Sequence, residues 1–393
     1  MPMKIALTGN YAVAYAVKLA KPQVIAAYPI TPQTPIVEKL SEFVESGELK
    51  AKMIRVESEH SALAACLGAA LAGARVFTAT SSQGLLYMHE IIHWASRVRA
   101  PMVMAVVSRT INAPWNIWPD HSDFLDQRDA GWVMAYAMDN QEAFDLTLQA
   151  FKISEDPEVY LPVMVGLEGF VLGHTAMPVE IPDEKDVDAW LGERRQPYVV
   201  DGSEPIGVGG LAWPEDTEDM FYGIQQAMER TKNVIKRVDA EYGKLLGRSY
   251  GGPIQCYRCE DAKYIAISMG AWSGELMEAV NMLRDEGYPI GVARIRFYRP
   301  FPHEDLWEVT RGARAVFVFD RAISFGSWGQ IYTDLVAGLL LHTNKLPPVM
   351  DVVAGIAGVH VSAEDFYAIT KKLIEKVESG HDIGYFEWIR VRR

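Results

Sequence analysis

The segment from Met53 to Leu85 constrains the fold of this chain more than any other. It opens with a short β-type run, Met53–Val56, and continues with an alanine- and leucine-rich stretch that stops at Gly73. The residue types and their spacing predict a closely packed helix, which the glycine ends. A second β-type run over 75–79 and a polar turn follow, so the segment predicts a β-α-β unit. Such units bind ligands at the carboxyl ends of their strands, and Glu59 lies at one such end.

The chain has 393 residues and a formal net charge of −13. This length is typical of two or three domains. The acidic balance argues against nucleic acid or an anionic membrane as the main partner. The sequence has neither an apolar run of about 18 residues nor a secretory signal pattern, so we expect a cytoplasmic protein. Three cysteines are too few for a disulfide framework.

A rigid turn follows the predicted strand Val24–Ala27. Three prolines between positions 28 and 35 each restrain their own φ angle and the residue before them. Thr31 lies between two of these prolines and therefore has little backbone freedom. Its hydroxyl suits a contact with a ligand, and it also suits the N-cap of a helix over Ile36–Phe43. The turn by itself leaves both interpretations open.

A second candidate residue, Arg109, follows an all-apolar run from Pro101 to Val107. The run predicts a strand that is buried on both faces. An arginine just past such a strand is well placed to hold a carboxylate through two parallel hydrogen bonds, although a solvated loop residue fits the same position. The loop over 112–123 combines aromatic and polar residues, which indicates a pocket wall or a subunit contact.

Three short motifs match known site patterns but lack the context that those sites need. Residues His89 to His93 read H-E-x-x-H without a downstream third ligand, so we interpret them as part of a packed or interface helix over 85–97. Residues 207–212 match G-x-G-x-x-A, but a Trp-Pro pair follows instead of a helix. Cys256 and Cys259 form a C-x-x-C without a second pair, which disfavours a structural metal or a redox site. We therefore assign no metal site to this chain.

The alternation of strand and helix patterns divides the chain into three parts. Residues 1–174 predict an open parallel-sheet domain. Residues 175–262 are punctuated by prolines and predict an irregular linker with one amphipathic helix. Residues 263–393 return to the alternation, with one strand over 290–297, and predict a second, smaller α/β domain.

Several sequence runs resemble the 2-oxoacid:ferredoxin oxidoreductases. In the order found in that family, the chain carries YPITPQTP (28–35), VESEHSALAACLGAALAGARVFTATSSQGL (56–85), a strand ending in Ser108-Arg109, and Pro119-Asp120-His121. The run YRPFP (298–302) is typical of the second domain. The resemblance is to the alpha subunit of the archaeal multi-subunit type, which includes 2-ketoisovalerate and pyruvate enzymes, and it covers essentially the whole chain. It implies a thiamine-diphosphate-binding domain of the pyrimidine type, followed by a transketolase C-terminal-like domain.

This resemblance also implies an activity: oxidative decarboxylation of a 2-oxoacid to an acyl-CoA, with thiamine diphosphate as cofactor and electrons passed to ferredoxin. By motif position, Glu59 is the glutamate that bonds the aminopyrimidine ring and promotes loss of the cofactor C2 proton. Arg109 would pair with the substrate carboxylate, and Thr31 would hydrogen-bond the carboxylate or the keto oxygen. The other implied cofactor contacts are Pro29, Ile30, Ser82 and Gln83.

Two absences imply partner subunits. The chain has no GDG motif, which thiamine enzymes use for diphosphate and Mg²⁺, and its three cysteines do not suffice for a [4Fe–4S] cluster. The resemblance therefore implies a beta subunit with the diphosphate and Mg²⁺ site, a gamma subunit, and a ferredoxin-like delta subunit with the clusters. The proline turn and the loop Trp115–Trp118 resemble the branched-chain or broad-specificity members. A pyruvate-specific member and a transketolase-like thiamine transferase are the alternatives.

Overall fold

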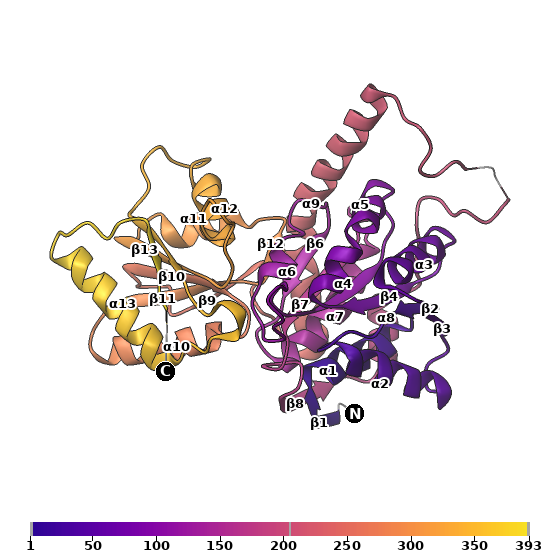
Figure 1. Ribbon diagram of the computed structural model, residues 1–393, viewed down its shortest axis with the longest axis horizontal. Coiled ribbons are helices and arrows are strands. Elements are labelled where there is room, and N and C mark those ends of the chain that lie inside the picture. The colour runs from indigo at the N-terminus through magenta and orange to yellow at the C-terminus, as the bar shows by residue number, and fades with distance from the viewer. Residues whose placement is uncertain (1–2, 204–205, 391–393) are drawn as a thin grey trace.

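Continuously apolar strands build two parallel-rich sheets, which lie side by side along the long axis of the molecule (Figure 1). The computed structural model describes residues 3–203 and 206–390. Helices cover the faces of each sheet, so the central strands are buried on both faces. This is the environment that parallel strands require.

The first sheet has seven strands in the order β12-β6-β7-β5-β4-β2-β3. Its parallel strands are β2 (Val24–Ala27), β3 (Lys52–Arg55), β4 (Val76–Thr80), β5 (Val103–Ser108), β6 (Val133–Tyr136) and β7 (Val163–Glu168). β12 (Phe297–Arg299) pairs antiparallel with β6 at one edge. The expected strands of this domain are thus present, and the predicted site residues follow the carboxyl ends of β2, β3, β4 and β5.

Seven helices between these strands cover the two faces of the first sheet. They are α1 (Gly9–Ala20), α2 (Thr34–Glu45), α3 (Glu59–Leu71), α4 (Ser82–Tyr87), α5 (His89–Arg97), α6 (Ser122–Leu125) and α7 (Asn140–Ser154). Strand β5 shows which helices cover which face of the sheet. Val103, Ala105 and Val107 pack on one face in the core with α1 and α7, whereas Met104 and Val106 pack on the other face in the core with α3 and α5. The helix expected over 85–97 is interrupted at Met88 and begins earlier, at Ser82.

The second sheet has six strands in the order β15-β14-β13-β10-β11-β9. Its strands are β9 (Ile254–Tyr257), β10 (Tyr264–Met269), β11 (Ile290–Ile295), β13 (Ala315–Asp320), β14 (Val349–Val353) and β15 (Phe386–Trp388). Its helices are α10 (Ser273–Asp285), α11 (His303–Thr310), α12 (Gln330–Leu339), α13 (Ala363–Glu378) and the short 3₁₀ turn Ile356–Gly358. Only β9 runs antiparallel to its neighbour among these strands.

The single strand expected over 290–297 is instead two strands in two different sheets. β11 ends at Ile295 in the second sheet, and β12 begins at Phe297 in the first. Buried charges hold this crossing: Arg294 donates both ends of its guanidinium to Glu142 of α7 at 2.8 and 2.9 Å, and Arg296 Nε donates to the same carboxylate at 2.6 Å. Two buried arginines on one buried carboxylate therefore fasten the domains together.

The stretch 175–262 contains more regular structure than the predicted irregular linker with one helix. β8 (Ala176–Ile181) pairs antiparallel with β1 (Met3–Thr8), α8 (Glu184–Leu191) follows, and β9 joins the second sheet. The expected amphipathic helix is α9 (Pro214–Leu246), which packs on α7, and its first turns project beyond the body of the molecule (Figure 1). The domain boundaries at 174 and 262 stay a prediction. Within 3–203 and 206–390, no helix has the length and apolarity to cross a membrane.

Candidate active site

Glu59 is the first residue of α3, directly after the extended Ser58 that caps this helix. Its side chain is 7% exposed. A methyl group added at Gly84 would lie 2.7 Å from Glu59 Oε1 and 2.5 Å from Thr80 Oγ1, so the absence of a side chain at Gly84 lets the carboxylate fit. Among the described residues no donor binds this carboxylate. Glu59 is therefore a largely buried acceptor at the carboxyl end of the first sheet, held where a helix N-terminus favours negative charge.

Arg109, at the end of β5, is 2% exposed. Its Nη1 donates to the carbonyl oxygen of Thr31 at 2.6 Å, and its Nη2 donates to Gln83 Oε1 at 3.0 Å. Its Nε has no hydrogen-bond partner among the described residues. Burial lowers the pKa of the guanidinium, while the carboxylates of Asp123 and Glu59 act to raise it. A buried arginine with an unused donor is suited to an anionic ligand.

Ser82 and Gln83 lie at the start of α4, where Gln83 contacts Arg109 and the next residue, Gly84, packs against Glu59. Gln83 Nε2 donates to the carbonyl oxygen of Asn112 at 3.3 Å, so its amide links α4 to the loop after β5. The Ser82 hydroxyl is buried, 2.8 Å from the carbonyl oxygen of Thr110 and 2.7 Å from Gln83 Oε1. Ser82 thus supports Gln83, while Gln83 itself stays partly exposed.

Asp123 is a site residue that the sequence did not single out. Its Oδ2 accepts the backbone N–H groups of Ser82 at 2.8 Å and Arg109 at 3.1 Å, and its Oδ1 accepts that of Phe124 at 2.7 Å. Burial raises the pKa of this carboxyl to about 7, against the opposite effect of the backbone hydrogen bonds. Asp123 therefore clamps together the two segments that carry Ser82 and Arg109. Its position in the polar and aromatic loop was the only sequence signal for it.

Thr31 contacts Arg109 through its backbone carbonyl oxygen and does not cap a helix. α2 begins at Thr34 with Gln33 as its cap residue, so the N-cap interpretation of Thr31 is wrong. The exposed side chain of Thr31 has no partner among the described residues, and its carbonyl oxygen accepts from Arg109. Two buried amides hold the turn: Gln33 Nε2 donates to the carbonyl oxygens of Tyr28 and Ala79 at 2.9 and 3.0 Å.

The second buried amide is that of Asn10, whose Nδ2 donates to the carbonyl oxygen of Pro32 at 2.9 Å. The carbonyl oxygen of Ile30 accepts from the backbone N–H of Gln33 at 2.8 Å, which closes the turn. Gln33 and Asn10 were not predicted, because a single polar residue that satisfies backbone groups across 46 or 22 positions leaves no local pattern.

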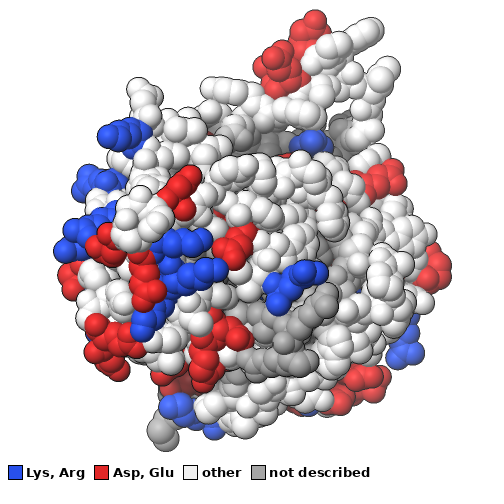
Figure 2. Space-filling view, turned by 60° about the vertical axis from the view of Figure 1, so that its left-hand side comes forward, with Lys and Arg blue, Asp and Glu red and all other residues white. Residues whose placement is uncertain are grey.

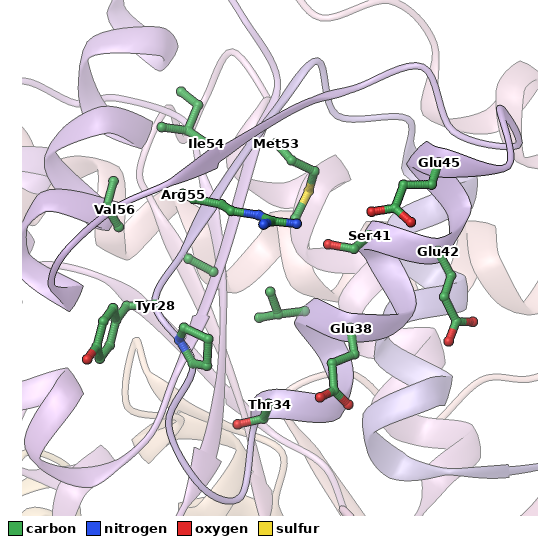
Figure 3. Close-up of a pocket in the computed structure, with 13 residues that line it drawn as sticks. Tyr28, Thr34, Glu38, Ser41, Glu42, Glu45, Met53, Ile54, Arg55 and Val56 are labelled. Carbon is green, nitrogen blue, oxygen red and sulfur yellow. The ribbon is translucent and has the colours of Figure 1, made fainter.

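Pro29 lies on the other side of this turn, in a groove of about 620 Å³ between α2 and the edge strand β3 (Figure 3). Figure 3 shows the Arg55 side chain pointing from β3 toward Ser41 of α2. The groove wall also carries the carboxylates of Glu38, Glu42 and Glu45. Three carboxylates disfavour an anionic cofactor or substrate, and neither Glu59 nor Arg109 lines this groove. It is therefore separate from the candidate active site, although both share the proline turn.

The aromatic and polar loop joins the site to the second domain. Asn116 Nδ2 donates to the carbonyl oxygen of Ala357 at 3.2 Å, and Asp120 Oδ2 accepts the Ala357 N–H at 3.0 Å. Trp115 is 78% exposed, and its ring lies 5.4 Å from the Arg109 guanidinium. The loop is thus a wall of the candidate site and a domain contact at once.

The remaining motifs form no metal centre in the parts of the chain that the structure describes. His89 Nε2 and His93 Nε2 are 3.3 Å apart, and Gln127 Oε1 lies 2.7 Å from His89 Nδ1. Across 3–203 and 206–390, no three or more His, Cys, Asp or Glu side chains group as a metal site would require. Cys256 is exposed and Cys259 is half-buried, with its Sγ 3.2 Å from the carbonyl oxygen of Val292.

The fold and the site together define a class. The first α/β domain, with Glu59 and Arg109 at the carboxyl edge of its sheet, and the second α/β domain each match a family of thiamine-dependent oxidoreductases. The chain belongs to the 2-oxoacid:ferredoxin oxidoreductase family. Residues 15–240 match the family described as "Pyruvate flavodoxin/ferredoxin oxidoreductase, thiamine diP-bdg", and residues 262–366 match "Pyruvate:ferredoxin oxidoreductase core domain II". This confirms the family and the fold class that the motifs predicted.

Curated relatives match the chain over its whole length. The pyruvate synthase subunit PorA of Pyrococcus furiosus is 45% identical, and the ketoisovalerate oxidoreductase subunit VorA of Pyrococcus horikoshii is 44% identical; each match covers 100% of this chain and 99% of the relative. Two relatives named for different 2-oxoacids are thus about equally similar. Overall similarity therefore does not resolve which 2-oxoacid this chain serves.

Solved structures share the fold at low sequence identity. A 2-oxoglutarate:ferredoxin oxidoreductase from Magnetococcus marinus superposes with a TM-score of 0.73 and 18% identity, over 94% of this chain and 65% of the other. The chain thus spans about two thirds of that longer protein. A split-gene transketolase superposes with a TM-score of 0.55 and 14% identity, over 94% of this chain and 98% of the other.

Proposed function

We propose that this chain is the alpha subunit of a thiamine-diphosphate-dependent 2-oxoacid:ferredoxin oxidoreductase, which decarboxylates a 2-oxoacid oxidatively to an acyl-CoA. One observation carries the proposal: Glu59 and Arg109 lie at the same edge of the first sheet, and both contact the start of α4, Glu59 at Gly84 and Arg109 at Gln83. A carboxylate acceptor and a guanidinium donor side by side suit a cationic heterocycle and an anionic substrate.

Glu59 would hold the cofactor ring. Its carboxylate is 7% exposed and binds no donor of the described residues, so it is free to accept a hydrogen bond from a ring nitrogen. Thiamine diphosphate, when bound, supplies a carbanion-stabilising ring. The contribution of this chain would be to bind the aminopyrimidine through Glu59 and to keep it in the proton-accepting form. Ile30, Ser82 and Gln83 would form the remaining walls of this half of the cofactor site. The fourth predicted contact, Pro29, lines the separate groove between α2 and β3, so its contact with the cofactor stays a prediction.

Arg109 would bind the carboxylate of the 2-oxoacid. Its Nε has no partner, and its Nη1 and Nη2 are oriented by Thr31 and Gln83. A guanidinium held by two neutral acceptors keeps its charge for the ligand. The Thr31 hydroxyl, exposed beside it, would bond the carboxylate or the keto oxygen.

The chain would act only together with partner subunits. It has no GDG motif and three cysteines, so a beta subunit would supply the diphosphate and Mg²⁺ site, and a ferredoxin-like delta subunit would supply the [4Fe–4S] clusters. A gamma subunit completes the proposed assembly, with ferredoxin as the electron acceptor. A cytoplasmic location fits these partners.

For the substrate we favour branched-chain or broad specificity. Trp115 lies over Arg109, so the substrate side chain would meet a large flat aromatic surface rather than a charged one. A pyruvate-specific enzyme is the alternative, since the PorA and VorA relatives are about equally similar to this chain.

The test uses the complex co-purified through a tag on this chain. Viologen reduction that requires both a 2-oxoacid and CoA is the expected result, with 2-oxoisovalerate at least as good as pyruvate. Transfer of a ketol group between sugars without viologen reduction would instead support a transketolase-like transferase. A complex that reduces viologen with no 2-oxoacid would contradict the proposal.

A further inference from the structure

Large apolar side chains are exposed on α4, on α5, in the loop before α9 and on α9 itself. We call this group the α5–α9 patch; it consists of Tyr87, Trp94, Leu211, Trp213, Met220 and Phe221. Trp213 is 73% exposed, and Phe221 is 48% exposed. Trp94, Leu211, Met220 and Phe221 line one hollow. An exposed apolar group of this kind marks an interaction site, because its hydration is unfavourable.

The side chains of the patch are held in place by contacts between the loop before α9, α5 and α9. A methyl group added at Gly209 would lie 2.9 Å from a ring carbon of Trp94, so the loop before α9 packs closely on α5. The Arg97 guanidinium lies 4.0 Å from the ring centre of Phe221. Between these elements lies a cavity of about 480 Å³ lined by His93, Trp94, Leu211 and Phe221, among others. A concave apolar surface with a positioned arginine is typical of the buried centre of an interface.

The patch is continuous with the candidate active site. The ring of Tyr87 lies 5.8 Å from that of His60, the residue after Glu59. Glu90, one turn further along, contacts His60 Nε2 at 3.2 Å. From there α5 leads to Trp94. A molecule that approaches Glu59 over α4 and α5 therefore covers the patch.

Charge around the patch selects the kind of partner. The first turns of α9 project from the body (Figure 1) and carry four exposed acidic side chains, Glu215, Asp216, Glu218 and Asp219. Figure 2 shows acidic side chains at this upper projecting end, without basic ones beside them, whereas both signs are interspersed over the second domain. Residues 196–229 contain no lysine or arginine. Two copies of this chain that met through their α9 tips would repel each other, so a different chain with a basic surface fits better.

We infer that the α5–α9 patch is the docking surface for the partner subunit that carries the diphosphate and Mg²⁺ half of the cofactor site. This inference rests on the proposed function, because only that partner must reach Glu59. The partner would cover Tyr87 and Trp94 with apolar side chains and would meet the acidic tip of α9 with lysines or arginines.

The test is made on the co-expressed complex with Phe221→Glu and, separately, with Asp219→Lys. Both should reduce by at least tenfold the amount of the diphosphate-binding subunit that co-purifies with this chain. Phe325→Glu is the matched control, because Phe325 is 91% exposed in the second domain and away from the patch. It should retain the partner. A thermal melt of each full-length chain alone should match wild type, which excludes misfolding as the cause.

Two results would overturn the inference. One is full recovery of the partner with Phe221→Glu. The other is that the wild-type chain alone forms a dimer and that Phe221→Glu dissociates it, since the patch would then bind a second copy of this chain. Failure of this inference can be told apart from failure of the proposed function. If the proposed function is wrong, the wild-type complex assembles but does not reduce viologen with a 2-oxoacid and CoA. If only this inference is wrong, the variants leave co-purification of the partner subunit unchanged.

Discussion

The carboxylate of Asp123 accepts the backbone N–H of Arg109 at 3.1 Å, and the same oxygen accepts the N–H of Ser82 at 2.8 Å. One buried side chain thus sets the distance between the segment that would bind the substrate and the segment that would bind the cofactor. The proposed chemistry depends on this spacing, because a substrate must sit within reach of both.

Asp123→Asn should weaken substrate binding. An amide has one oxygen where the carboxylate has two, so at least one of the three backbone N–H groups loses its acceptor. An unsatisfied buried donor costs about 1–3 kcal/mol. We expect a lower melting temperature and a KM for the 2-oxoacid that rises more than the KM for CoA. Asp126→Asn, an exposed neighbour at the end of α6, is the control and should change neither. Equal changes in both KM values would argue against a positioning role.

Glu142→Gln should destabilise the junction between the domains. Burial acts to raise the pKa of Glu142, but Arg294 and Arg296 outweigh it, so that the pKa falls to about 2. Because the pKa is lower in the folded chain than in the unfolded chain, the ionised carboxylate stabilises the fold at pH values above the ordinary carboxyl pKa. This stabilisation is lost as the pH falls toward 2. Leaving two buried arginines without their carboxylate costs about 3–5 kcal/mol.

Denaturant unfolding at pH 7 and at pH 3 checks the Glu142 prediction. Glu142 becomes partly protonated as the pH falls from 7 to 3, so the wild type should lose part of the stabilisation that this carboxylate provides. The difference in the free energy of unfolding between wild type and variant should therefore be smaller at pH 3. Glu158→Gln breaks an exposed pair with Arg237 and should cost less than about 1 kcal/mol. A Glu142 variant as stable as this control would contradict the account of the junction.

Glu59→Gln should abolish exchange of the cofactor C2 proton while the complex still assembles. A neutral amide of the same shape keeps the packing against Gly84 but withdraws the carboxylate from the ring nitrogen. Hydrogen–deuterium exchange at C2, followed by NMR in the purified complex, measures this step without turnover. Glu57→Gln, two residues earlier and exposed, should exchange at the wild-type rate. Wild-type exchange in the Glu59 variant would remove its assigned role.

Arg109→Lys should raise the KM for the 2-oxoacid roughly ten- to a hundredfold. Lysine keeps the charge but loses the planar fork, and one charge-assisted hydrogen bond is worth about 1.5–3 kcal/mol. Thr31→Val should act in the same direction by less, since a neutral hydroxyl contributes about 0.5–1.5 kcal/mol. Steady-state kinetics beside thermal melts measures both effects. Arg311→Lys, on the exposed surface, is the control. An unchanged KM in both variants would end the substrate-binding assignment.

Gly84→Ala should displace Glu59. The added methyl group would lie 2.7 Å from Glu59 Oε1 and 2.5 Å from Thr80 Oγ1, which is closer than van der Waals contact allows. We expect slower C2 exchange and a lower melting temperature. Gly68→Ala is the matched control, because Gly68 lies within α3 with open space around it. That change should stabilise the chain by about 0.5–1 kcal/mol, as glycine is unfavourable inside a helix. A harmless Gly84→Ala would mean that the carboxylate has room to move.

The amino-acid sequence by itself determined the local elements and the family. The strand, helix and strand of the segment Met53–Leu85 could be predicted because their signals, apolar runs and an alanine-rich stretch with a terminal glycine, lie within a few residues of one another. The same holds for Arg109, which follows a buried strand. Motif position singled out Glu59 as a candidate, and the predicted helix start at this residue is present, since its neighbours in the sequence are also its neighbours there.

Only the tertiary structure decided which distant groups meet. Arg109 finds the carbonyl oxygen of Thr31 across 78 positions, and Arg294 finds Glu142 across 152. The expected strand 290–297 divides between two sheets because Arg294 and Arg296 turn to one carboxylate at the crossing. Such partners are selected by burial, where an unpaired charge or N–H is costly, and burial exists only once the sheets have packed. Asp123 is the clearest case: a single acidic residue in a loop became the clamp of the site through backbone amides 41 and 14 positions away.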